Sequence, residues 1–259
     1  MLMVNQLVGF QAVAADVFSA AALSLNAWWD PSDLTTLWQD TGRTTAVTAD
    51  GQTVWCIDDK TGNGRHLKLV SSGPVYKTSG GLHWLEFNGS SQYLETTQGM
   101  DAFVSGSASE CFAAFRMTSP ETDSSGFDND ACFADSSGYS TYGYGRSSGL
   151  IGVAAYNTSF GTVSQTSSYT SGTDVVLSCG WDASNMRLSK DNSADSTVSF
   201  TPQSGAYSNS GVKLRLGRDN NTRYAQLRFY GGAFKSTTLT AGERTAFCTW
   251  LGAKQGRSI

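Results

Sequence analysis

A chain of 259 residues is long enough to bury a hydrophobic core of its own, without disulfides or metal ions to hold it together. Only 15% of its residues are charged, and the abundance of serine, threonine, glycine and aromatic residues favours strands and turns. The net charge is −4 and the 18 basic residues form no cluster. Nucleic acid is therefore not expected as a partner, because a phosphate backbone is bound by a concentrated positive face.

Residues 1–18 differ from the rest of the chain. They are mildly apolar without a clear period, polar residues interrupt them, and no positively charged segment opens them. They match neither a signal peptide nor a membrane span, so we expect an arm at 1–18 followed by one domain at 19–259. The alanines of 13–25 leave a helix open as an alternative.

From Trp28 onward, short apolar segments alternate with Gly, Ser, Asn and Asp turns, a pattern typical of an antiparallel sandwich. In the segment around Trp84, Leu85 and Phe87 share one strand face and Trp84 shares the other with Glu86. No helices alternate with the strands, which disfavours a parallel α/β sheet. The predicted strands are 27–30, 53–58, 82–88, 92–95, 110–117, 131–135, 140–146, 149–156, 173–181, 185–190, 212–218 and 225–234.

One helix is predicted near the C-terminus. Thr240 and Glu243 have the spacing of a capping box, and Phe247 and Leu251 lie four residues apart on one helix face. Lys254 complements the helix dipole at the other end. The prediction is an all-β, two-sheet antiparallel sandwich with a short C-terminal helix.

The five cysteines, an odd number at wide spacing, form neither a disulfide framework nor a C-x-x-C pair. We therefore expect buried free thiols, as in a protein assembled in a reducing cytoplasm. They are Cys56, Cys111, Cys132, Cys179 and Cys248.

Several blocks of the sequence resemble a family of bacteriophage and prophage virion proteins with concanavalin A-like (laminin G-like) jelly-roll domains. In one block, Phe87, Gly89, Tyr93 and Leu94 are similar to a hairpin of that family. The resemblance extends over residues 26–254. Its blocks are 29–40, 44–51, 58–67, 82–94, 214–218, 225–234 and 240–251.

The resemblance implies a jelly roll on the virion surface, in a head or tail fibre, a spike or a decoration subunit, displaying a lectin-like domain for host-surface glycans. The arm at 1–18 would attach it to other virion proteins, in many copies or as an oligomer. It would be made in the host cytoplasm without a signal peptide and would not insert into a membrane. Two alternatives remain open: a glycan-active enzyme of the same fold, and a purely architectural subunit without a ligand.

Catalytic patterns are absent. A retaining glycosidase of this fold would carry Glu-x-Asp-x-x-Glu on one strand, to place two carboxylates about 5 Å apart. Glu121 and Asp123 come nearest, but the third carboxylate is missing. His66 and His83, the only histidines, lie in no catalytic motif and are expected to be structural. We therefore predict no enzymatic activity and no catalytic residues.

A run of tyrosines and glycines marks the candidate glycan site. Tyr139, Tyr142, Tyr144 and Arg146 alternate with small residues, and tyrosine faces stack on sugars while arginine adds hydrogen bonds. The alternative is a strand whose tyrosines fill the core.

An oxygen-rich segment is the main candidate metal site, ahead of Asp219 and its two neighbouring asparagines. Asp123, Asp128 and Asp130 suggest calcium, which prefers six to eight oxygen ligands from such loops. They are equally ordinary turn residues, and no other cofactor is expected.

Among the tryptophans, Trp28, Trp84, Trp181 and Trp250 are expected to pack in the interior, whereas Trp38 and Trp55 are left undecided.

Overall fold

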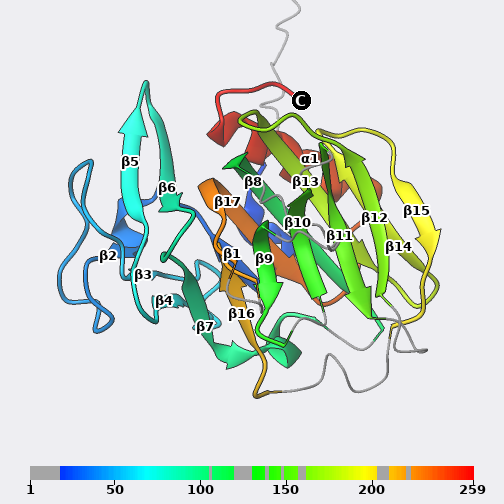
Figure 1. Ribbon diagram of the computed structural model, residues 1–259, viewed down its shortest axis with the longest axis horizontal. Coiled ribbons are helices and arrows are strands. Elements are labelled where there is room, and N and C mark those ends of the chain that lie inside the picture. Colours follow the sequence, from blue (N-terminus) through cyan, green and yellow to red (C-terminus); the bar gives the residue numbers. More distant parts are fainter. Residues whose placement is uncertain are drawn as a thin grey trace, which may run out of the picture.

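A computed structural model shows two antiparallel β-sheets packed face to face, with one α-helix on the outside (Figure 1). It confirms the predicted fold class. The structure describes residues 18–104, 107–119, 130–137, 140–146, 149–156, 162–202, 210–219 and 223–259.

The first sheet, sheet A, has eight strands in the order β15-β14-β13-β8-β17-β6-β5, and β1 pairs with one end of β17. Its strands are β1 (Ala27–Trp29), β5 (Val75–Ser79), β6 (Leu82–Asn88), β8 (Ser109–Ser119), β13 (Asp174–Trp181), β14 (Asn185–Lys190), β15 (Ser196–Ser199) and β17 (Gln226–Lys235).

The second sheet, sheet B, has nine strands in the order β12-β11-β10-β9-β16-β7-β4-β3-β2. Its strands are β2 (Leu37–Trp38), β3 (Cys56–Ile57), β4 (Leu67–Leu69), β7 (Leu94–Gly99), β9 (Asp130–Asp135), β10 (Ser140–Arg146), β11 (Leu150–Tyr156), β12 (Thr162–Ser168) and β16 (Lys213–Leu216).

The main core lies between the two sheets. It contains Trp29, Phe87, Phe133 and Trp181, all almost completely buried, and aromatic pairs such as Trp29 and Phe133, 5.7 Å apart between ring centroids, fill it. Leu85 joins Phe87 in this core, as the alternation of that segment predicted.

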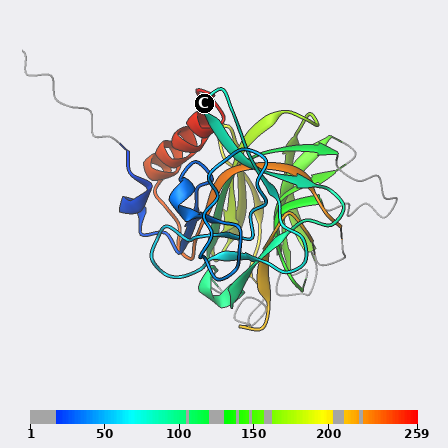
Figure 2. The same cartoon turned by 90° about the vertical axis from the view of Figure 1, so that its left-hand side faces the viewer.

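A second hydrophobic cluster covers the outer face of sheet A. Helix α1 (Ala241–Lys254) begins with the predicted capping box, in which the Thr240 hydroxyl accepts from the backbone N–H of Glu243. Phe247 and Leu251 of α1 pack on this face, and Figure 2 shows the helix lying against the outside of the sandwich. Phe18 packs on Phe247, with 6.1 Å between the ring centroids.

The strands that the sequence did not predict are mostly short or at sheet edges. β5 and β15 end sheet A, and β12 and β2 end sheet B. Edge strands rich in serine and threonine, such as β12, lack the apolar alternation that marks a strand with one buried face. The stretch 92–95 was predicted too early, since β7 begins at Leu94.

Short 3-10 helices complete the described fold. In the alanine-rich stretch, where a helix was left open, the structure shows η1 (Ala20–Leu23), and residues 1–17 lie outside the described part. The other two are η2 (Leu34–Thr36) and η3 (Met100–Ala102).

All five cysteines are buried with free thiols, which confirms that prediction. In the described part of the chain, no helix is both long and apolar enough to cross a membrane.

Candidate functional site

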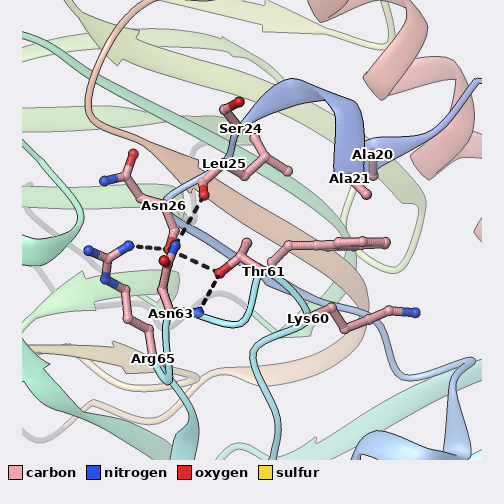
Figure 3. A pocket seen from close by; sticks show the side chains of 10 residues that line it. Ala20, Ala21, Ser24, Leu25, Asn26, Lys60, Thr61, Asn63 and Arg65 are labelled. Carbon is pink, nitrogen blue, oxygen red and sulfur yellow. Dashed lines mark hydrogen bonds between the residues drawn. The ribbon is translucent and has the colours of Figure 1, made fainter.

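A groove lies between the segment 20–28 and the loop 60–65 (Figure 3). Its volume is about 480 Å³, enough for a small ligand. It is open to solvent on one side, with the loop and the η1 segment as walls. Its lining residues are Ala20, Ala21, Ser24, Leu25, Asn26, Trp28, Lys60, Thr61, Asn63 and Arg65.

The loop wall of the groove is folded around one buried carboxylate, that of Asp59. Its oxygens accept hydrogen bonds from the backbone N–H groups of Trp28 (3.1 Å), Thr61 (3.0 Å) and Arg65 (3.1 Å). Bonds from a carboxylate to backbone N–H groups are charge-assisted and strong. Gly62, between them, has φ +83°, a value that side chains other than glycine rarely adopt. Asp59 thus fixes the loop and joins it to β1.

Trp28 of β1 lies at the base of the groove. Its indole packs against Trp250 of α1 (5.6 Å, edge to face), and the Lys60 ammonium lies 4.6 Å above its ring. Lys60 is held there by the carboxylate of Asp33 at 2.7 Å. The Trp28 Nε1 is buried without a hydrogen-bond partner among the described residues. The base of the groove is therefore a fixed aromatic surface with a charged side chain over it.

A row of N–H donors lines the rest of the groove. In Figure 3, the side chains of Asn63 and Arg65 both reach toward the backbone of Asn26. The Asn63 amide donates to the Asn26 carbonyl at 3.0 Å, and the Arg65 guanidinium donates to the same carbonyl. Burial lowers the pKa of Arg65, and the carboxylates of Asp59 and Asp101 oppose this. These donors are held in place before any ligand arrives.

Behind the loop, His66 and its neighbours hold the start of the turn. The Asp58 carboxylate lies 3.0 Å from His66 Nδ1 and accepts from Trp38 Nε1 at 2.9 Å. Arg43 lies 3.2 Å from Asp58 and 3.0 Å from His66 Nε2. Burial lowers the pKa of His66, Asp58 raises it and Arg43 lowers it further. The backbone N–H of Asp59 also donates to His66 Nδ1, at 3.1 Å, so donors face both ring nitrogens and favour a neutral imidazole. His66 is structural, as expected.

The sequence-predicted tyrosine site does not hold for Tyr142, which is fully buried. Its ring stacks on Trp181 (5.7 Å, 18°) and meets Phe234 edge-on at 5.0 Å, and its hydroxyl lies 3.1 Å from that of Ser109. A ring enclosed between two sheets cannot touch a sugar, so Tyr142 as a glycan contact is wrong. It belongs to the core, the alternative that the sequence left open.

The structure does not test the other residues that were predicted for the glycan site and the calcium site. Tyr144 and Arg146 lie on β10, but their side chains are outside the described part, and Tyr139 is outside it altogether. Of the proposed calcium ligands, Asp123 and Asp128 lie outside the described residues and Asp130 begins β9 without a described side chain. Within the described ranges, no group of three or more His, Cys, Asp or Glu side chains gathers for a metal ion.

The tryptophans divide largely as expected. Trp84 and Trp181 are buried, and Trp250 packs between Trp28 and Phe247. Of the two left undecided, Trp38 is half-buried and bonded to Asp58, and Trp55 is 41% exposed.

Sequence reasoning missed the groove. The structure confirms the turn after Asp59 and the buried position of Trp28, but nothing in the sequence indicated that the two border a groove. In this turn Asp59 accepts from the backbone N–H groups of Thr61 and Arg65, and the side chains of Asn63 and Arg65 donate to the carbonyl of Asn26. What the sequence could not show is that residues 20–26 lie across from this turn.

The fold is shared with known structures. No protein-family model matches the sequence, and neither does a curated protein. One similar solved structure is the Botulinum Neurotoxin serotype G binding domain, 10% identical with a TM-score of 0.54, where the match covers 88% of this chain and 51% of the other. A second is a mutant of HCR/D, 8% identical with a TM-score of 0.61, covering 91% of this chain and 57% of the other.

A third similar structure is a GH54 α-L-arabinofuranosidase, 16% identical with a TM-score of 0.52, covering 89% of this chain and 63% of the other. The chain thus spans about half to three fifths of the length of these matched chains. At such identities the likeness shows the β-sandwich fold alone, and the fold accommodates both binding domains and an enzyme.

Proposed function

We propose that this chain is a non-catalytic saccharide-binding domain displayed on the surface of a bacteriophage particle, where it adheres to host glycans. The observation that carries the proposal is the groove beside Trp28, whose donors are fixed around Asp59 and Asn26. Sugars present many hydroxyl groups that both donate and accept, so a lining of amide, hydroxyl and guanidinium groups held in place suits them.

The Asn63 side chain shows how a sugar would be held. Its amide nitrogen donates to backbone carbonyls of Asn26 and Leu25, at 3.0 and 3.4 Å. Its carbonyl oxygen has no partner among the described residues, and the residue is exposed. The amide is therefore locked in orientation while one acceptor faces outward for a sugar hydroxyl.

The chemistry of the lining supports binding without catalysis. The ten lining residues contribute amide, hydroxyl, ammonium and guanidinium groups, with no carboxylate, histidine or cysteine among them. A retaining or inverting glycosidase needs two carboxyl groups at the scissile bond. Asp59 lies beneath the loop with its oxygens already bonded to backbone N–H groups.

The proposed location rests on the resemblance of residues 26–254 to phage virion proteins. The binding domains among the similar structures are consistent with a role in adhesion. Because the arabinofuranosidase is an enzyme, the experiment also tests for enzymatic activity. Weak single sites gain avidity from multivalent display, which a particle surface provides.

The test measures retention of oligosaccharides and intact host cells by a multimerised form of the chain. We expect Asn63→Ala to weaken retention at least about tenfold, equivalent to about 1.4 kcal/mol. The matched control is Asn185→Ala, an exposed asparagine on β14. Antibody labelling of the particle in electron micrographs tests the location.

Three results would count against the proposal. Release of new reducing ends by the wild type would make the chain an enzyme. Absence of any retention, with the chain still present in particles, would make it architectural. An equal loss of retention in Asn63→Ala and Asn185→Ala would mean that the groove is not the binding site.

A further inference from the structure

The groove contains one positively charged side chain without a matching negative one. Lys60 is neutralised, because its ammonium lies 2.7 Å from the carboxylate of Asp33 and 3.6 Å from that of Asp30. The backbone N–H of Arg65 donates to Asp59, but its guanidinium has no carboxylate oxygen within 4.0 Å among the described residues. Elsewhere in the described chain, arginines of comparable burial are paired, as in Arg116 with Asp174 at 2.6 Å and Arg215 with Glu95 at 2.8 Å.

The environment of Arg65 makes this unpaired charge costly. The side chain is half-buried, and its guanidinium lies 5.8 Å from the ring of Phe103. Burial disfavours the charged form, in keeping with the lowered pKa. Asp59 and Asp101 act on it only at longer range. A cation in such a place is stabilised when an anion arrives in the groove beside it.

Most of the hydrogen-bonding capacity of Arg65 is also unused. A guanidinium carries five N–H donors. Among the described residues, the Arg65 side chain donates from Nη1 to the Asn26 carbonyl. That bond holds one end of the group at the groove wall, and its other N–H donors have no partner in the described part of the chain. A planar fork of this kind matches the two oxygens of a carboxylate.

We infer that the saccharide bound in this groove is acidic and carries a carboxylate, which Arg65 holds with Asn63 beside it. This inference rests on the proposed function and names the ligand class. The net charge of the chain is −4, so long-range attraction does not bring an anion in. Selectivity for the acidic sugar comes from short-range contacts with Arg65 and is retained at physiological salt, because contacts at hydrogen-bond distance are screened less than distant charges.

The test uses an array in which each uronate-containing oligosaccharide is printed beside its carboxyl-reduced product, together with sugar polymers linked by phosphodiesters. Wild-type protein in multimerised form is expected to retain the uronates at least about tenfold better than their reduced partners. Better retention of the phosphodiester polymers would overturn the carboxylate assignment. This arm uses wild-type protein alone and does not depend on the folding of a variant.

A second arm assigns the selectivity to Arg65. Arg65→Met keeps an unbranched apolar stem and removes the guanidinium, so it is expected to abolish the difference in retention between the two members of each pair. The control Arg228→Met, on β17 and outside the groove, should keep the difference. Equal retention of both members of each pair by the wild type would overturn the inference alone. Absence of retention of every saccharide would overturn the proposed function, and the inference with it.

Discussion

Strand β10 and the loop 59–65 have similar residue compositions, but their side chains lie in different environments. Both combine glycines with polar and basic residues beside an aromatic side chain, yet β10 directs Tyr142 into the space between the sheets and the loop holds its polar side chains at the surface. The decisive difference is what lies opposite each segment. β10 faces Trp181 and Phe234 from sheet A, whereas the loop faces the η1 segment across an open groove.

The comparison shows that the surface role of an aromatic run depends on its tertiary partner and not on its composition. In β10, Gly143 has φ +66° and lies where the pairing with β11 shifts by a residue, and an added Cβ there would come 3.0 Å from the ring of Phe115. This β-bulge is packed against the core, so its glycine serves close packing. In the loop, the glycines permit the turn and leave the neighbouring side chains accessible.

The largest expected effect is a difference in the free energy of unfolding between a variant in β10 and a variant in the loop 59–65. Tyr142→Ala removes a fully buried ring and should lower the free energy of unfolding by about 4 kcal/mol. Asn63→Ala, at the exposed groove, should change it by less than about 0.5 kcal/mol. Urea denaturation of both variants measures this. A loss below about 1 kcal/mol for Tyr142→Ala would place its ring outside the core.

A smaller effect is expected at the carboxylate that shapes the loop. Asp59→Ala leaves buried backbone N–H groups of Trp28, Thr61 and Arg65 without an acceptor and should cost about 3 kcal/mol. Asp182→Ala, in an exposed turn where Asp182 accepts from two backbone N–H groups, should cost about 1 kcal/mol. Thermal unfolding compares them. Equal losses would mean that Asp59 is no more than an ordinary turn residue.

The pH dependence tests whether the loop is held by a neutral His66. Burial lowers its pKa from the ordinary value of 6.5, so around pH 6 the folded chain binds fewer protons at this site than the unfolded chain. Stability from this site is therefore present above pH 6.5 and is lost as the pH falls through that value and below it.

The measurement is the free energy of unfolding as a function of pH for the wild type and for His66→Gln. Glu110, whose pKa is raised by burial, titrates as well, so the difference between wild type and variant isolates His66. His66→Gln should flatten the slope. An unchanged slope in His66→Gln would show that this imidazole does not titrate differently on folding.

The smallest expected effect concerns the cysteines. Cys111 and Cys179 lie directly opposite each other on β8 and β13, and the structure has them as free thiols. A reducing agent should therefore leave the melting temperature unchanged. A drop of several degrees under reduction would reveal a cross-strand disulfide in the isolated protein.

The sequence predicted the sandwich and its C-terminal helix because these depend on local periodicity. The alternation around Leu85 and the capping box at Thr240 are visible in any window of a few residues. Tyr142 was misassigned because either face of β10 satisfies the same pattern, and only the packing of sheet A on sheet B selects one. The groove was missed because its walls, at 20–28 and 60–65, are brought together by contacts between segments more than 30 residues apart, such as that of Trp28 with Asp59.

The pairing of β1 with β17 has a consequence for how the chain matures. Ala27 and Trp29 of β1 pair in antiparallel register with Phe234 and Gly232 of β17, so one wall of the groove is supported by a strand more than 200 residues later in the chain. During synthesis this wall has no sheet partner until β17 has left the ribosome. A chain cut short before β17 would lack the support of β1 and hence the groove. In the proposed function, ligand binding therefore requires that β17 has been made and has paired with β1.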